Sequence, residues 1–242
     1  MEYFLDSAET ITPGLGFSHF DGVHLAWLGL FVISIVVCTV WFKKMNQRGR
    51  DVFKKTIALS LIIMEVLKIS LLALTGRFRW GYLPFHLCGI NIFLIVAHAW
   101  KPTRLLDNFL YLICIPGALA ALLFPNWTAL PVRNIYHIHS SIVHILLVMY
   151  PLVQALNGIL DLDIKMVPKC LGLLVLMAIP IYGLNLLWGT NFMFLMRADA
   201  GNPLVLFEQM WGSHLLGFPV IIAAVVVVMY LPIFVRNRKK KV

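Results

Sequence analysis

The 242-residue sequence has few charged residues, which make up only 13% of it, whereas hydrophobic residues make up 60%. So little polar surface cannot cover a water-soluble globule, and a lipid bilayer is therefore the expected solvent. The loops between the apolar runs are short and leave no room for a soluble domain. We expect one transmembrane domain over residues 1–242.

Cysteine is also scarce. The four cysteines (Cys38, Cys88, Cys114 and Cys170) lack the spacing of a disulfide framework or a zinc ribbon. The first 20 residues contain no basic stretch, and the first apolar run begins late and is long. We therefore expect this run to remain as an anchor rather than to be removed as a signal peptide.

What the sequence does contain is apolar runs of about 20 residues, the length that lets a helix cross about 30 Å of hydrocarbon. Seven such runs predict an all-α polytopic membrane protein with seven transmembrane helices. The runs lie at 23–42, 56–75, 81–100, 105–124, 136–157, 167–188 and 212–235.

Lysine and arginine are distributed unevenly between alternate loops. Fifteen of the 20 lie on one side, four lie on the other, and Lys68 lies inside the second run. Because basic residues resist translocation, the N-terminus is predicted outside and the C-terminal RNRKKK tail inside. The net charge of +9 then needs no nucleic-acid partner. The expected partners are membrane lipids, and no sequence feature marks an oligomeric face.

Polar side chains inside the apolar runs are informative, because each is costly in lipid unless it is paired or functional. Most of them are predicted at the outer ends of the helices. They are His86, Cys88, His137, His139, His144, Asn185 and His214. We interpret this group as a cavity open to the outer leaflet, although any single histidine can instead be an interfacial packing residue.

The second run also contains two opposite charges near its middle. Glu65 and Lys68 are three residues apart, so they share a helix face and can neutralise each other. We expect a structural ion pair that fixes helix packing, with a proton relay or a substrate-headgroup contact as the alternative.

Cys88 is the only good nucleophile in the outer group, because a thiol ionises more readily than a hydroxyl. On a regular helix Asn91 shares its stripe, whereas His86 lies about 200° away and is a poor base for it. The base should then come from another helix. The alternative is that Cys88 is only a small packing residue.

The run at 136–157 is the richest source of a base. His137 and His144 share one stripe, whereas His139 faces away from His137, and periodicity does not choose between them. A thiolate and an imidazole at this level suit acyl transfer from a lipid ester. Asn185 or a backbone N–H would hold the oxyanion.

Other classes of function have less support. A metal site lacks carboxylates at the depth of the histidines, so we predict no metal and no cofactor. A transporter or solute-binding component without catalytic activity remains the alternative function. It would need polar residues continuing to the cytoplasmic end, where only His98 and Asp107 continue them. An opsin-like sensor is disfavoured, because the last run has no lysine for a Schiff base.

Four motifs carry a resemblance that spans nearly the whole chain. They are FDGVHLAW (20–27), YLPFHLC (82–88), HIHSS (137–141) and NLLWGTNFMF (185–194). Together they resemble the YwaF-like family of bacterial seven-helix membrane proteins. That family is similar to a vertebrate transmembrane acyltransferase that moves a polyunsaturated acyl chain between phospholipids through a cysteine thioester. It is more distantly similar to threonine-dependent membrane hydrolases of fatty-acid esters.

The resemblance implies a lipid acyltransferase or lipid ester hydrolase at the outer leaflet of the bacterial cytoplasmic membrane. It implies Cys88 as the nucleophile and His139 as the base. The hydrolases have their threonine at position 84, which is Pro84 here, so a threonine mechanism is not available.

Overall fold

The structure is a computed structural model that describes residues 3–199 and 203–239, with side chains to residue 234. Among these residues, six helical segments are long and apolar enough to cross a membrane. They are α1 (Gly22–Lys44), α2 (Gln47–Leu74), the continuous segment α4 (Arg104–Phe109), η2 (Leu110–Cys114) and α5 (Ile115–Leu123), then α6 (Ile135–Leu156), α7 (Val167–Trp188) and α9 (Gly217–Lys239). The chain is therefore a multi-pass membrane protein.

The third predicted span differs from the other six. Its helix, α3, covers only Leu87–Trp100, whereas the sequence predicts helix from residue 81. Fourteen residues at 1.5 Å each reach about 21 Å, less than the hydrocarbon thickness of about 30 Å. The preceding residues contain only the short 3₁₀ turn η1 (Trp80–Tyr82) and then Pro84. The predicted count of seven crossings depends on this short helix.

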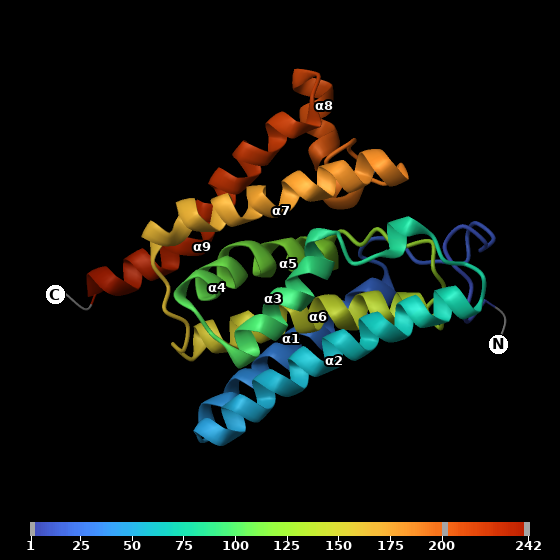
Figure 1. Cartoon of the computed structure of the whole chain (residues 1–242). Coiled ribbons are helices and arrows are strands. Elements are labelled where there is room, and N and C mark those ends of the chain that lie inside the picture. Colours follow the sequence, from blue (N-terminus) through green and yellow to red (C-terminus); the bar gives the residue numbers. More distant parts are fainter. Residues whose placement is uncertain (1–2, 200–202, 240–242) are drawn as a thin grey trace.

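The helices form two groups (Figure 1). Helices α1 to α6 pack together, and α7, α8 (Leu204–Trp211) and α9 lie beside them as a second layer. Short 3₁₀ turns join the segments of the second layer: η3 (Ile164–Met166), η4 (Phe192–Phe194) and η5 (His214–Leu216). The sequence treats residues 189–211 as loop, so α8 is an addition to the predicted elements.

The segments between the helices gather at two ends of the bundle. At one end, which we call the N-terminal side, the Ile135 N–H donates to the Phe4 carbonyl at 2.9 Å and the Phe17 N–H to the Thr128 carbonyl at 2.9 Å. At the other end, the basic side, Arg104 contacts Asp161 and Asp163 at 3.0 and 2.9 Å.

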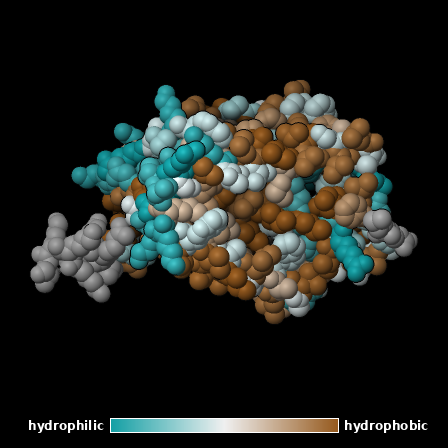
Figure 2. All heavy atoms as spheres, turned by 90° about the horizontal axis from the view of Figure 1, so that it is seen from below, coloured by the Kyte–Doolittle hydropathy of each residue, from teal (hydrophilic) through white to brown (hydrophobic). Residues whose placement is uncertain are grey.

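The surface follows this division. Figure 2 shows hydrophilic residues concentrated at the end toward which α9 runs, and hydrophobic residues over the middle of the bundle. Exposed apolar side chains such as Leu176 (65%) and Leu187 (74%) on α7 face outward, as expected of a helix in lipid. Lys240 and Lys241 of the predicted cytoplasmic tail lie outside the described residues.

Side-chain caps explain where two of the helices begin. The Asp21 carboxylate caps α1 by accepting from the backbone N–H groups of Ser18 and His24 at 2.8 and 2.9 Å, and these bonds lower the pKa of Asp21. Asn46 caps α2 by accepting from the Gly49 N–H. Helix α2 therefore begins nine residues before the predicted run, because its first turns are polar and hydropathy does not mark them.

The fourth span contains a π turn at η2. Pro116 follows it and has no N–H to bond the carbonyl four residues earlier, so the helix widens there. The Tyr111 hydroxyl donates to the Met229 carbonyl at 2.6 Å and so ties the π turn to α9. The buried core surrounds this turn, with Leu110 and Leu112 fully buried.

Candidate functional site

Cys88 lies in the first turn of α3 and is half-buried. His86 is the residue that precedes this helix, with extended φ and ψ of −66° and 155°, so helical spacing does not describe its direction from Cys88. The His86 Nδ1 instead accepts the Met193 N–H at 3.3 Å. The predicted opposition of Cys88 and His86 on one helix therefore does not apply.

Cys88 packs against the apolar core. In the part of the chain that the structure describes, its thiol makes no hydrogen bond and no ion pair, so it is not paired with an imidazole. Asn91, one turn further along α3, is fully buried. Neither its Oδ1 nor its Nδ2 has a hydrogen-bond partner among the described residues.

The charged residues of α2 face His139 of α6. The Lys68 Nζ lies 2.6 Å from the Glu65 Oε1, so the expected ion pair is present. The Glu65 Oε2 lies 3.7 Å from the His139 Nε2, which is buried and has no hydrogen bond within the described residues. The structure thus adds an imidazole to the pair that the sequence predicts.

Two polar side chains of this region share a cavity: Lys68 of α2 and His139 of α6 both line the small space between these helices. His144 donates from Nδ1 to the Ser140 carbonyl at 2.7 Å and stacks on Trp127, with ring centroids 5.0 Å apart. We call the following residues the Cys88 cluster: Glu65, Lys68, His86, Cys88, Asn91, His139 and His144.

His137 has a different environment from these three histidines. The Trp27 Nε1–H donates to its Nε2 at 2.8 Å, which leaves its Nδ1–H to donate to the Leu130 carbonyl at 3.2 Å. Both ring nitrogens are therefore occupied, and the side chain is fully buried. His137 joins α1, α6 and the loop before α6.

Asn185 and His214 also hold the fold together. The Asn185 Oδ1 accepts from the Thr190 hydroxyl and the Phe192 N–H at 2.8 Å each, and its Nδ2 donates to the Phe192 carbonyl at 3.0 Å. The His214 Nε2 lies 3.0 Å from the carbonyl of Phe194. These bonds fix a loop in which Met193 and Phe194 have left-handed φ values of 57° and 55°, a conformation that needs outside support in a residue with a side chain.

A second polar network lies at the basic side, where the sequence indicates only isolated polar residues. The His98 Nε2 lies 2.6 Å from the Asp107 Oδ1, and its Nδ1 lies 2.7 Å from the Tyr150 hydroxyl. The Asp107 Oδ2 accepts the Asp161 N–H at 3.0 Å. His98 and Asp107, near the predicted cytoplasmic ends of two separate runs, were the available signal, but helical spacing cannot pair residues from different helices.

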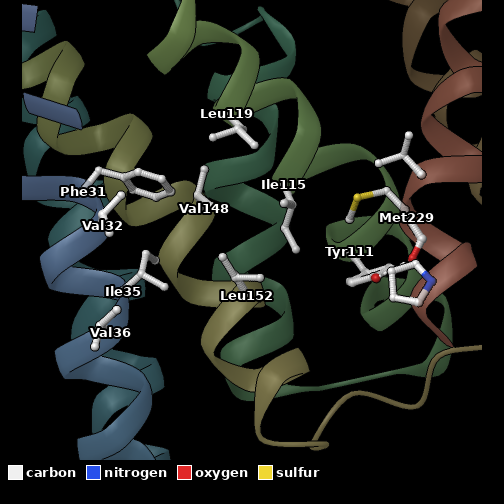
Figure 3. Close-up of a pocket in the computed structure, with 12 residues that line it drawn as sticks. Phe31, Val32, Ile35, Val36, Tyr111, Ile115, Leu119, Val148, Leu152 and Met229 are labelled. Atoms are coloured by element: carbon white, nitrogen blue, oxygen red, sulfur yellow. Dashed lines mark hydrogen bonds between the residues drawn. The ribbon is translucent and has the colours of Figure 1, made fainter. Parts of the chain in front are cut away.

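Two cavities open on the apolar surface. A groove of about 410 Å³ lies between α1, α5, α6 and α9 and is lined almost wholly by apolar side chains such as Phe31, Ile115 and Leu152 (Figure 3). A smaller cavity of about 140 Å³ lies between α2 and α6, and Lys68 and His139 are part of its lining. Only the smaller cavity adjoins the Cys88 cluster. Within the described residues, no three His, Cys, Asp or Glu side chains converge to hold a metal.

The fold and these polar groups together define a multi-pass helical membrane protein with buried, partly unpaired polar residues among its helices. The chain belongs to the TMEM164 family, which it matches over residues 15–230. No curated protein and no solved structure matches the chain.

Proposed function

We propose that the protein is a lipid acyltransferase or lipid ester hydrolase that works through an acyl-thioester on Cys88, with His139 as its general base. The observation that carries this proposal is a half-buried thiol at the start of a helix, one turn from a buried amide, that of Asn91, with no hydrogen-bond partner among the described residues. Unpaired polar groups are costly within a membrane, and they are retained where they serve a function.

The reaction has two halves. The Cys88 sulfur attacks the ester carbonyl of a lipid, so the C–S bond forms and the ester C–O bond breaks. His139 takes the thiol proton and gives it to the departing hydroxyl. In the second half His139 takes the proton of a lysolipid hydroxyl or of water as that oxygen attacks the thioester carbonyl; the C–S bond breaks, and His139 gives the proton to the departing sulfur. Glu65, 3.7 Å from the His139 Nε2, is placed to stabilise the imidazolium that forms between these transfers.

The pairing of the histidines supports His139 over its neighbour two residues earlier. His137 has both nitrogens engaged, so it has no lone pair for a proton. The His139 Nε2 is free of hydrogen bonds within the described residues. Since Cys88 and His139 are not bonded to each other, lipid binding must bring them into reach, as is common for catalytic pairs without substrate.

Orientation decides which lipids the cluster meets. The basic residues favour a cytoplasmic basic side, which would put the Cys88 cluster at the outer leaflet. The resemblance to bacterial proteins suggests the cytoplasmic membrane of a bacterium. Reporter fusions at the C-terminus test this topology: a reporter active only in the cytoplasm should be active there, and an inactive one would reverse the proposed substrate leaflet.

Transport has less support from the basic side. A solute path would need polar groups free to bind cargo there, but His98 bonds to both Asp107 and Tyr150, and Asp107 also accepts the Asp161 N–H. Those groups already form a closed network. The acyl-transfer proposal needs no such path.

The proposal is tested by looking for the thioester. The purified full-length protein is incubated with a phospholipid whose acyl chain carries an alkyne, and Cys88 is examined by peptide mass spectrometry before and after hydroxylamine. We expect an acyl adduct on Cys88 that hydroxylamine removes. The Cys88→Ala variant should lose it, whereas Cys38→Ala, which changes another half-buried cysteine, should keep it. Undiminished acyl exchange by Cys88→Ala would exclude the covalent mechanism.

A further inference from the structure

Asn91 is an anomaly among the buried residues of α3. Its neighbours Ile92 and Ile95 fill the core with apolar side chains, and Asn91 is just as fully buried. No residue that the structure describes hydrogen-bonds to its amide nitrogen or oxygen. If packing were its only role, leucine would fill nearly the same volume without burying an unpaired amide.

The position of Asn91 directs its amide toward Cys88. Residues three apart lie on one face of a helix, and the Cα–Cβ bonds tilt toward the helix N-terminus. The side chain of Asn91 therefore leans back over the turn that contains Cys88. The amide is thus placed to contact an atom bound to the Cys88 sulfur.

The start of α3 adds further donors at the same place. The first N–H groups of a helix have no partner within the helix, and no side chain caps α3. His86, which holds the capping position, bonds to the Met193 N–H instead. The preceding segment also packs very closely here: a Cβ on Gly89 would lie 2.6 Å from the Pro84 carbonyl oxygen. This uncapped helix end favours negative charge beside Cys88.

We propose that the Asn91 Nδ2, together with the first N–H groups of α3, binds the carbonyl oxygen of the acyl group that reacts with Cys88. This inference rests on the proposed function and adds the oxyanion-binding residue to it. When the sulfur bonds to the acyl carbon, the carbonyl electron pair moves onto the oxygen, and the Asn91 amide donates a hydrogen bond to that oxyanion. The oxyanion then re-forms the carbonyl and expels the lipid oxygen, and Asn91 keeps its protons throughout.

The test compares two reactions of the same thiol in the full-length protein. Acylation by p-nitrophenyl butyrate passes through an oxyanion, whereas alkylation by iodoacetamide is a direct displacement without one. Both rates are followed at Cys88 by peptide mass spectrometry. In Asn91→Leu we expect acylation to slow by about 10²- to 10³-fold, the usual loss for one oxyanion donor, and alkylation to stay within about threefold.

Thermal stability and a matched variant exclude a purely structural role. Asn91→Leu should unfold at the same temperature as the wild type or higher, because it removes a buried amide that has no partner. Asn108 is equally buried, but its amide donates to two carbonyls and accepts from the Asp163 N–H and the Tyr230 hydroxyl. Asn108→Leu should therefore lower the unfolding temperature and leave the ratio of the two rates unchanged.

Each other outcome overturns the inference. If acylation and alkylation slow equally, Asn91 acts on access to the thiol. If the ratio of the acylation rate to the alkylation rate is unchanged in Asn91→Leu, or if wild-type Cys88 does not react with p-nitrophenyl butyrate, Asn91 does not bind an acyl carbonyl. The proposed function is tested separately, by the phospholipid reaction. If the wild type forms no phospholipid adduct but Asn91→Leu still slows acylation by p-nitrophenyl butyrate selectively, the proposed function fails and the acyl-carbonyl site is still supported. Equal phospholipid adducts in both proteins overturn the Asn91 role alone.

Discussion

The two ends of α3 differ in whether their polar groups have hydrogen-bond partners. At its C-terminal end, His98 uses both ring nitrogens, one with Asp107 and one with Tyr150. At its N-terminal end, Cys88 and Asn91 make no hydrogen bonds to the rest of the described chain. The first arrangement completes the fold, whereas the second contains the residues that we propose as the nucleophile and the carbonyl donor.

The same contrast occurs on α6 between two histidines of one motif. The His137 ring bonds to Trp27 and to the Leu130 carbonyl, whereas the His139 Nε2 makes no hydrogen bond within the described residues and lies 3.7 Å from the Glu65 carboxylate. Changing a polar group that has hydrogen-bond partners should therefore lower the stability of the fold. Changing one that has none should instead alter the rate of Cys88 acylation. The predictions below test this division, beginning with the largest expected effect.

Exchanging His139 for glutamine should slow thioester formation on Cys88 by about 10²- to 10⁴-fold, the usual contribution of a general base. Its unfolding free energy should change little, since its Nε2 contributes no hydrogen bond within the described residues. The rate is measured by single-turnover acylation, and stability by denaturant unfolding in detergent.

His137→Gln is the matched control, two residues away on the same helix. It loses two buried hydrogen bonds, so it should lower the unfolding free energy by about 1–3 kcal/mol. The acylation rate per folded molecule should stay within about threefold. The reverse result, with His137 controlling the rate and His139 the stability, would contradict the assignment of the base.

Much of the membrane topology is readable from the sequence because hydrocarbon demands about 20 apolar residues per crossing. The run at 167–188 coincides with α7, and the run at 136–157 lies within one residue of α6. The start of α3 was not readable. Hydropathy continues through residues 81–86, but the helix begins only at Leu87, after Pro84 and the extended His86, and no apolar count detects that extended backbone.

For the candidate site, the sequence indicates residue types and depth but not hydrogen-bond pairing. It places Cys88 and His139 in the predicted outer group, and the ion pair of Glu65 and Lys68 near the middle of its helix. It could not tell that His137 is saturated, because its donor, Trp27, lies 110 residues away on α1. Hydrogen bonds between distant helices depend on packing, and a single sequence with helical spacing does not specify packing.

The ion pair on α2 offers the next largest effect. Lys68→Met leaves the buried Glu65 carboxylate with only His139 nearby, and we expect a loss of about 3 kcal/mol of unfolding free energy. The double variant Glu65→Leu with Lys68→Met removes both charges and should recover most of that loss. Denaturant titrations of the wild type, the single variant and the double variant measure these changes in unfolding free energy. A double variant as unstable as the single one would show that shape, rather than charge pairing, matters at these positions.

A smaller effect is expected at the C-terminal end of α3, where the polar groups are hydrogen-bonded. Asp107→Asn replaces a buried carboxylate that accepts from His98 and from the Asp161 N–H, so one of these donors meets an amide N–H instead. Leaving a buried donor unsatisfied costs about 1–3 kcal/mol. Denaturant unfolding should show this loss, while the rate of Cys88 acylation per folded molecule should not change, because the network lies at the opposite end of the helix.

Asp51→Asn makes the same chemical change where water can compensate for it. The Asp51 side chain is 42% exposed and pairs with Lys54 at 2.8 Å, so its loss should cost between about 0 and 1 kcal/mol. Equal losses at Asp107 and Asp51 would show that burial does not strengthen the basic-side network. A selective drop in acylation at Asp107 would instead connect the two ends of α3, and the division between folding and chemistry would no longer hold.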